Sequence, residues 1–332
     1  MSDRPARPRW LDRKPEPPHA VAAYRWLLGR DPESAQTAER LAAASLTLAE
    51  LRDRVLNSAE CRAQFDPMRW RPMPLDIPAL EIESEATPTQ IAALLERIGR
   101  AWGALGETEP HWSVLTDERF RGERLAGNLA SFMASGETSA KTMAAMLARH
   151  GVTPESHPRL VEFGCGVGRV TLPLARRFAQ VTGCDVSPGH LAVARDAAEQ
   201  AGLGRIAWWQ VRVEALLPPA PWDIWYSHLV LQHNPPPLVR HILRQAFAGL
   251  APGGVALFQV PTHIRGYRFV VADYLARAGD GGMEMHALPQ EAVFALAADA
   301  GLQVLEVRDD SHLTTREAGR FLSHSYLFRR PA

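Results

Sequence analysis

The stretch VEFGCGVGRVTLPLA, residues 161–175, decides the fold of this chain. Its apolar start is typical of a buried strand, its end has the pattern of a helix, and Gly164, Gly166 and Gly168 lie between them. In a parallel sheet covered by helices, such a strand-to-helix turn is a ligand site. Glycine lets a ligand approach the backbone closely, and the helix N-terminus offers unpaired N–H groups. The stretch therefore predicts an α/β sheet with a cofactor site in this turn.

A second signal lies at the end of the next apolar run. QVTGCDVS, residues 180–187, places Asp185 about 20 residues after Gly164, the spacing known from nucleotide-binding folds. A carboxylate at the end of the second strand can accept hydrogen bonds from both hydroxyls of a ribose. Ser187 followed by Pro188 has the form of a helix start. Either motif alone is common, but in this order they predict a site for a nucleoside-containing cofactor.

After residue 157, short apolar runs alternate with helical patterns, which is typical of a parallel sheet with helices on both faces. We expect helices at 168–178, 188–201, 236–250 and 289–300. The final run, SHSYLFRR, alternates in polarity and is expected to pair with LQVLEV at the sheet edge. The expected strands before it are RLVEFGC, QVTGCDV, RIAWWQV, DIWYSHL, VALFQV and LQVLEV.

The glycine spacing distinguishes two cofactor families. A dinucleotide fingerprint requires GxGxxG, but Arg169 stands three residues after Gly166. GxGxG with Glu162 two residues before it resembles the first motif of class I S-adenosylmethionine-dependent methyltransferases. WDIWYSHLVLQHNPPP and LAPGGVALFQV resemble the fourth and fifth strands of that family with their flanking segments. The resemblance covers residues 157–330 and implies a Rossmann-like, doubly wound, seven-stranded and mostly parallel sheet whose last strand is antiparallel.

The resemblance implies S-adenosyl-L-methionine as the cofactor and assigns residues to it. Glu162 would hold the positively charged amino group of its methionine end, and Asp185 the ribose. The adenine contact stays open, because Arg212 stands where an acid is often found; Gln210, Val211 and Glu214 are the candidates. The remaining predicted cofactor contacts are Gly164, Cys165, Gly166, Gly168, Val186, Ser227 and His228.

Two histidines are candidates for catalysis. Methyl transfer depends mainly on alignment of the acceptor, and a hydroxyl acceptor also benefits from a general base. His263 follows the expected fifth strand, and His233 follows the fourth. The alternatives are a loop histidine on the surface for His263 and a helix-start residue bonding local backbone for His233.

Five further residues are candidates for acceptor binding. Trp112 precedes the first motif, and an aromatic wall beside a sulfonium would gain cation–π attraction; simple core packing is the alternative. Arg265 and Tyr267 flank His263, where solvated loop charges are the alternative. Glu284 and His286 could lie on one side of an extended stretch, or cap the next helix. We expect no metal, because ligands at a recognisable spacing are missing.

The front of the chain has a different character. AYRWLLGRDPES and LAELRDRVLNSAECRAQF resemble a short bacterial helical domain of unknown function that accompanies carbohydrate-related enzymes. Thr47 to Glu50 has the form of a capping box. The predicted organisation is a disordered arm at 1–18, an accessory helical domain at 19–66, which could bind a protein partner, a proline-rich linker at 67–85, a helical cap at 86–156 and the methyltransferase domain at 157–330.

Composition excludes several classes of protein. Lys+Arg and Asp+Glu both total 37, whereas nucleic-acid binders usually carry a basic excess; SHLV also stands where an NPPY-like tetrapeptide is expected in nucleic-acid methyltransferases. The three cysteines suggest neither a disulfide framework nor zinc. The charged, proline-rich start is not a signal peptide, and no 18 apolar residues run together. A cytoplasmic bacterial protein fits this pattern.

The sequence thus predicts a methyltransferase acting on a small-molecule or glycan acceptor, by O-methylation. The alternative is a binding or scaffold protein that kept the fold and lost turnover.

Overall fold

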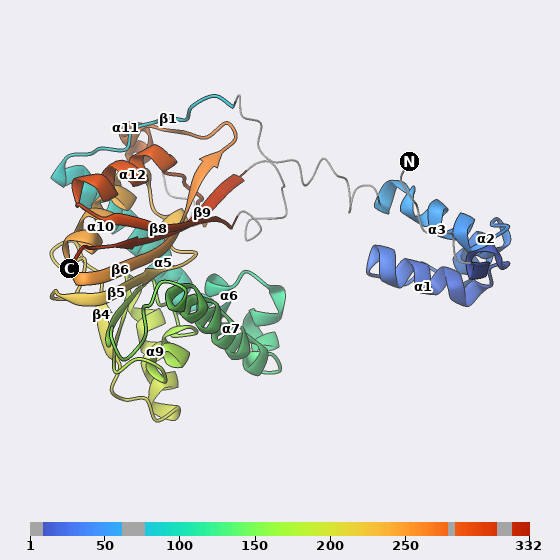
Figure 1. Cartoon of the computed structure of the whole chain (residues 1–332), viewed down its shortest axis with the longest axis horizontal. Helices are drawn as coiled ribbons and strands as arrows, with labels where there is room; N and C mark the ends of the chain where they lie inside the picture. The colour runs from blue at the N-terminus through green and yellow to red at the C-terminus, as the bar shows by residue number, and fades with distance from the viewer. Residues whose placement is uncertain (1–8, 62–76, 278–282, 311–320) are drawn as a thin grey trace. The chain divides into compact units, whose positions relative to one another are not determined.

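The computed structural model describes residues 9–61, 77–277, 283–310 and 321–332. The chain divides into two compact units, residues 1–74 with 317–319 and residues 75–316 with 320–332 (Figure 1). No described helix combines the length and the apolar character that crossing a bilayer requires. Within the same residues, no three His, Cys, Asp or Glu side chains are grouped so that they could hold a metal ion.

The smaller unit is helical. A 3-10 helix at Arg9–Asp12 precedes α1 (Pro17–Leu28), α2 (Ala35–Ala43) and α3 (Leu48–Leu56). Half of the capping box expected for α3 is present: Thr47 Oγ1 accepts a hydrogen bond from the backbone N–H of Glu50 at 3.2 Å. The Glu50 carboxylate accepts from the N–H of Leu46 at 2.7 Å instead of from that of Thr47. Helical structure therefore begins before residue 19, inside the segment predicted as a disordered arm, of which residues 1–8 lie outside the described part. The smaller unit has two small apolar clusters. One holds Ala20, Ala38 and Leu51, and the other holds Leu28, Val55 and Cys61.

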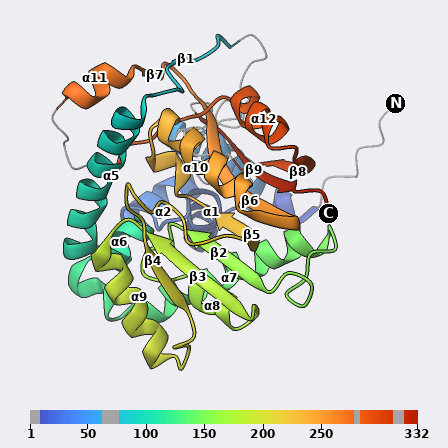
Figure 2. The ribbon, with the colours of Figure 1, turned by 90° about the vertical axis from the view of Figure 1, so that its left-hand side faces the viewer.

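The larger unit is built on a seven-stranded sheet in the order β4-β3-β2-β5-β6-β9-β8 (Figure 2). The strands from β2 to β6 are mutually parallel, and β9 is antiparallel to both β6 and β8. This confirms the predicted doubly wound, mostly parallel sheet. The strands are β2 (Arg159–Phe163), β3 (Gln180–Asp185), β4 (Ala207–Gln210), β5 (Trp222–Ser227), β6 (Leu250–Ile264), β8 (Gln303–Asp309) and β9 (Phe321–Arg329).

Helices cover both faces of this sheet because successive strand residues point to opposite sides. Val161 and Trp225 belong to a core shared with α5 (Pro88–Thr108), α10 (Pro236–Ala248) and α12 (Gln290–Asp299). Their neighbours Leu160 and Ile224 belong to a second core, shared with α7 (Leu129–Ala148) and α8 (Thr171–Ala175). Helix α9 (Pro188–Gln200) packs on β3 and β4.

The segment predicted as a helical cap, residues 86–156, does not form a separate layer. Helices α5 and α7 pack on opposite faces of the sheet, because each has an apolar stripe that the sheet buries. Between them in the chain lie α6 (Pro110–Val114) and two 3-10 helices, Glu118–Phe120 and Gly122–Leu125. Of the predicted linker, residues 67–76 lie outside the described part, and Glu81–Ile82 forms β1, which pairs with β7 (Arg268–Phe269). The short α11 (Val271–Ala276) follows β7.

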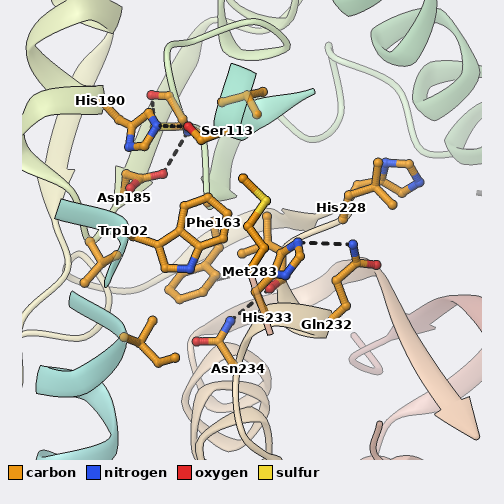
Figure 3. Close-up of a pocket in the computed structure, with 18 of the residues that line it drawn as sticks. Trp102, Ser113, Phe163, Asp185, His190, His228, Gln232, His233, Asn234 and Met283 are labelled. Atoms are coloured by element: carbon orange, nitrogen blue, oxygen red, sulfur yellow. Dashed lines mark hydrogen bonds between the residues drawn. The ribbon is translucent and has the colours of Figure 1, made fainter. Parts of the chain in front are cut away.

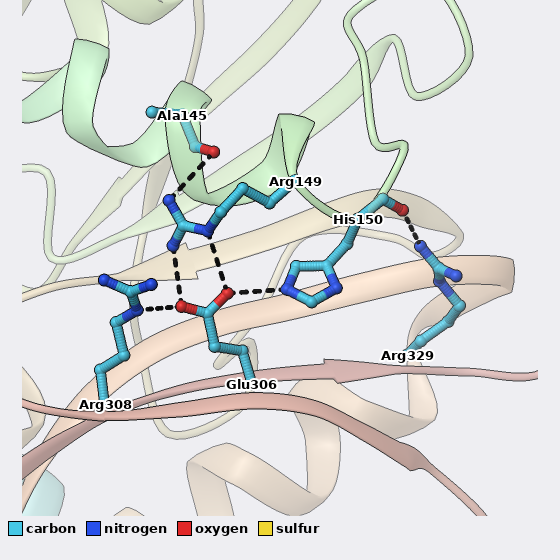
Figure 4. Close-up of polar contacts among 6 residues, drawn as sticks. All are labelled: Ala145, Arg149, His150, Glu306, Arg308 and Arg329. Atoms are coloured by element: carbon cyan, nitrogen blue, oxygen red, sulfur yellow. Dashed lines mark hydrogen bonds and ion pairs between the residues drawn. The ribbon is translucent and has the colours of Figure 1, made fainter.

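An ion cluster joins the end of α7 to β8 (Figure 4). One oxygen of Glu306 accepts a hydrogen bond from Arg149 Nη2 at 2.7 Å, and the other lies 2.7 Å from His150 Nε2. Arg308 also contacts this carboxylate. The guanidinium of Arg149 is the largest cause that lowers the pKa of Glu306 to about 2, with His150 and Arg308 adding to it.

We expect Glu306→Gln to lower the free energy of unfolding by about 1–2 kcal/mol at pH 7, since it removes charged hydrogen bonds that solvent partly reaches. A carboxyl pKa below its unfolded value stabilises the fold above that value, so this difference should shrink as the pH falls below about 4.5. Urea unfolding between pH 3 and 8 measures it. The exposed Glu81→Gln is the control, and a difference that does not depend on pH would contradict the assignment.

Candidate active site

A cavity of about 710 Å³ lies at the carboxyl ends of β2, β3 and β5 (Figure 3). This is the edge at which open α/β sheets bind ligands. Its walls come from α5, α6, the turn after β2, the start of α9, the segment between β5 and α10, and residues Met283 and Met285. Segments far apart in the sequence thus meet around one space.

The glycine turn forms one wall, and the protein's own side chains require its glycines. Gly164 and Gly166 line the cavity with φ of 78° and 54°. A Cβ on Gly164 would lie 2.3 Å from Val230 Cγ2, and one on Gly166 would lie 2.6 Å from Val114 Cγ2. Gly168, predicted as a cofactor contact, does not line the cavity; its Cβ position faces Leu172 Cδ1 at 2.8 Å. Cys165 lies in the lining and is buried.

Asp185 ends β3 and braces this turn. Its Oδ2 accepts a hydrogen bond from the Gly166 N–H at 2.8 Å, and its Oδ1 accepts one from Ser187 N–H at 2.9 Å. Burial raises the pKa of Asp185, while the nearby His190 and the backbone N–H groups oppose that shift. The carboxylate lines the cavity and has lone pairs beyond the two that these bonds use.

Glu162 and Arg169 are both buried beside the turn, and the charge of each acts on the other. Thr171 Oγ1 donates to Glu162 Oε2 at 2.6 Å. Burial raises the pKa of Glu162 to about 7, against the hydrogen bond of Thr171 and the charge of Arg169. Arg169 Nη1 donates to the hydroxyls of Ser135 and Ser139 at 3.2 and 3.3 Å, and its buried Nε has no hydrogen-bond partner among the described residues.

Arg169 lines the cavity, a placement that we did not predict. A signal exists on α7: Gly136 lies between Ser135 and Ser139, and a Cβ there would come 1.9 Å from the carbonyl oxygen of Arg169. The small residues let α7 reach the turn and hold the guanidinium. Without the fold, however, nothing connects these two segments.

Trp112 does not line the cavity, although we predicted an aromatic wall there. The Arg121 guanidinium lies 4.6 Å from its ring centroid instead. The next residue, Ser113, faces the cavity and its Oγ lies 2.7 Å from His190 Nε2. Successive residues of a helix such as α6 point about 100° apart. The aromatic wall comes from Trp102, in the apolar stripe of α5 (Figure 3).

Among the predicted adenine and loop contacts, the apolar ones line the cavity. Val186 and Val211 do so, as does His228, whose ring stacks on Tyr226 with 6.3 Å between centroids. Gln210, Ser227 and Glu214 are outside the lining. Gln210 Oε1 accepts from Arg212 Nη2 at 2.7 Å, and Ser227 Oγ donates to the carbonyl of Phe163 at 3.1 Å. Glu214 is exposed to solvent.

The segment after α11 faces the cavity with the opposite side from the one we predicted. Met283 and Met285 line the cavity. Glu284 and His286 lie on one side of the segment as expected, 3.5 Å apart, but they pack away from the cavity. The Tyr274 hydroxyl contacts Glu284, and the Tyr267 hydroxyl lies 2.7 Å from His286 Nδ1. The neighbouring His286 is the largest cause that lowers the pKa of Glu284 to about 2.

The two histidines predicted for catalysis are placed differently. His263 lies in β6 opposite Leu322 of β9 and does not line the cavity; burial lowers its pKa. Arg265 beside it is exposed. His233 lines the cavity, and its ring centroid lies 5.2 Å from that of Trp102. Burial lowers the pKa of His233 to about 4.

Comparison with known proteins agrees with this geometry. The family model described as a methyltransferase domain matches residues 160–254. The larger unit is a class I S-adenosylmethionine-dependent methyltransferase domain. S-adenosylmethionine is its cofactor, in agreement with the glycine turn and Asp185.

Two curated relatives of this methyltransferase domain are bacterial enzymes. A trans-aconitate 2-methyltransferase of Streptomyces avermitilis is 36% identical over 135 residues, 40% of this chain and 49% of the relative. A ubiquinone biosynthesis O-methyltransferase of Stutzerimonas stutzeri is 30% identical over 157 residues, 45% of this chain and 66% of the relative. The chain spans about half the length of the first of these.

Among solved structures, a magnesium protoporphyrin IX methyltransferase of Synechocystis with bound S-adenosylhomocysteine aligns with a TM-score of 0.45. It is 16% identical, and the alignment covers 61% of this chain and 87% of that one.

The residues of the cavity fit the cofactor chemically. The amino group and the sulfonium of the cofactor are cationic, and the carboxylates of Glu162 and Asp185 line the space. The carboxylate of the cofactor is complementary to the guanidinium of Arg169, whose Nε has no partner among the described residues. Val186 and Val211, with Leu95 and Ile98 of α5, offer an apolar slot for adenine.

Proposed function

We propose that this protein transfers the methyl group of S-adenosylmethionine to a hydroxyl of a small-molecule acceptor. The observation that carries the proposal is the continuity of the cavity. The carboxylates of Glu162 and Asp185 line the same space as His228, His233, Met283 and Met285. A cofactor held by the two carboxylates would share this space with an acceptor held against the histidines and methionines, which we call the acceptor side.

The contribution of this chain to such a reaction is mainly alignment. S-adenosylmethionine supplies a methyl group already activated by a positively charged sulfur. Glu162, Asp185 and the glycine turn hold and orient the cofactor, Trp102 and α6 exclude water from it, and His228 lies on the acceptor side. Holding two reactants in line accounts for a large part of the rate of bimolecular reactions.

The lining of the acceptor side supports an acceptor with an apolar or aromatic face. Met283, Met285, Leu229 and Phe321 line it, and thioethers and aromatic rings favour flat apolar groups over the many hydroxyls of a sugar. We therefore favour a hydroxylated aromatic or alicyclic molecule over the glycan that the front domain suggested. A cytoplasmic location and a protein partner for residues 19–66 belong to the same proposal.

Calorimetry followed by a transfer assay tests this function. We expect S-adenosylmethionine and S-adenosylhomocysteine to bind, and the radiolabelled methyl group to move to members of a panel of phenols and alicyclic alcohols but not to sugars. Binding without transfer to this panel or to a bacterial metabolite extract would favour the scaffold alternative. Absence of binding would contradict both.

A further inference from the structure

A chain of hydrogen bonds runs under the acceptor side of the cavity. It begins at the backbone N–H of Leu229, which can only donate and bonds to Gln259 Oε1 at 3.1 Å. The Gln259 amide nitrogen must therefore point the other way. It donates to Gln232 Oε1 at 3.3 Å and to Ser323 Oγ at 2.6 Å. The Gln259 side chain is completely buried, so water cannot substitute for these partners.

The chain of hydrogen bonds continues to His233. Because Gln232 Oε1 accepts from Gln259, the Gln232 amide nitrogen faces His233 Nε2, at 3.2 Å, and donates to it (Figure 3). On the other side of the ring, Nδ1 lies 2.9 Å from the carbonyl oxygen of Glu284, which can only accept. The proton of a neutral ring is therefore on Nδ1, and the lone pair of Nε2 is already used. Both ends of the chain are backbone groups with a fixed role, so the groups between them have one consistent arrangement.

We propose that the chain Leu229–Gln259–Gln232–His233–Glu284 fixes His233 as its neutral Nδ1–H tautomer and makes it a positioning residue of the acceptor wall, not the general base. This inference rests on the proposed function only where it names an acceptor. The tautomer itself follows from hydrogen-bond roles in the protein alone.

The chain of hydrogen bonds positions two parts of the acceptor wall at once. At its start, Leu229 has a φ of 61°, a left-handed conformation that a residue with a Cβ adopts only when its surroundings hold it. At its end, His233 ties down Glu284, between Met283 and Met285. A second bond, from the His286 N–H to the carbonyl of Gln232 at 2.7 Å, fastens the same segment. Loss of the chain should therefore loosen both sides of the acceptor wall.

The surroundings keep the ring neutral. Trp102 of α5 lies on one side of the ring and the Glu284 carbonyl on another. The Glu284 carboxylate pairs with Tyr274, Arg97 and His286, and the charge of His286 disfavours a proton on His233. A proton added to Nε2 would face the N–H of Gln232. That conflict agrees with the lowered pKa of His233.

Long-range ¹H–¹⁵N NMR of protein labelled at histidine tests the tautomer directly, without cofactor or acceptor. The signals absent from His233→Gln identify the ring. We expect one neutral Nδ1–H tautomer and no protonation between pH 5.5 and 8. An Nε2–H tautomer, or a midpoint near 6.5, would overturn the inference whether or not the protein transfers methyl groups.

Two variants test positioning. Gln232→Leu removes the donor to Nε2, and Gln259→Glu keeps the acceptor for Leu229 but removes the donors to Gln232 and Ser323. In both we expect the Nε2 signal of His233 to shift, because this nitrogen loses or weakens its bond to the Gln232 amide while Nδ1 keeps the Glu284 carbonyl. We also expect an acceptor KM raised about tenfold and an affinity for S-adenosylhomocysteine that changes less than threefold. Gln245→Leu, which removes an amide bonded to His241 on α10, is the matched control. An unchanged His233 spectrum in both variants would overturn the inference, and the spectrum stands as a test even if no transfer is found.

Discussion

Replacing Asp185 with alanine should weaken the binding of S-adenosylhomocysteine by about ten- to hundredfold. The carboxylate ends β3 inside the cavity, and its two oxygens hold the N–H groups of Gly166 and Ser187. The change removes both the acceptor predicted for the ribose and the brace of the glycine turn. A hydrogen bond to a charged group contributes about 1.5–3 kcal/mol, and about 1.4 kcal/mol corresponds to a factor of ten.

Titration calorimetry at pH 7.5 measures this loss. Asp196→Ala removes the same charge from an exposed position on α9 and should leave the affinity unchanged. Asp185→Asn keeps the size and one acceptor, and we expect an intermediate affinity. A folded Asp185→Ala protein that binds as tightly as the wild type would show that the ligand does not use this strand end.

The second large effect is a dependence of cofactor binding on pH. We expect the affinity for S-adenosylhomocysteine to rise about tenfold from pH 6 to pH 8, because the ionised fraction of a carboxyl with a pKa of about 7 rises by about that factor over this range. With a pKa of about 7, the buried Glu162 is mostly protonated at pH 6. Only its anion can pair with the cationic amino group of the ligand, so binding below pH 7 must release a proton.

The stability of the ligand-free fold depends on pH in the opposite direction. A carboxyl pKa raised above its unfolded value stabilises the ligand-free fold below about pH 4.5, and this contribution is lost as the pH rises towards 7. The stabilisation by the ligand should therefore grow over the same range. Calorimetry in two buffers of different ionisation enthalpy counts the released proton. Glu162→Gln should bind weakly with little pH dependence; a variant that kept the full slope would assign it to another group.

The cofactor half of the site was accessible from the sequence because its signals are local. Glu162, the glycine turn and Asp185 lie on two successive strands and the turns that follow them, so periodicity alone places them at one edge of a parallel sheet. The acceptor half was not accessible in this way. It is assembled from α5, the residues before α10 and the segment around Met283, and no periodic pattern states which of these meet.

Three cases show which structural information could not be obtained from the sequence. The helix α6 has five residues, too short for its 3.6-residue period to reveal that Ser113 and not Trp112 faces inward. The alternation of Met283 and Glu284 was visible in the sequence, but it did not indicate which side of the segment would face the cavity. The position of His263 after an apolar run suggested an exposed strand end, whereas β6 continues through it and pairs with β9.

The sequence by itself therefore determined the layers of the fold, the order of its strands and helices along the chain, and the class of cofactor, since each of these depends on residues close together in the chain. Only the tertiary structure decided which aromatic residue walls the cavity, which side of the methionine segment faces it, and which proton His233 carries. Each of these depends on partners brought together from distant segments: Gln259 reaches Leu229, Gln232 and Ser323 only after β6, β9 and the turn after β5 have packed.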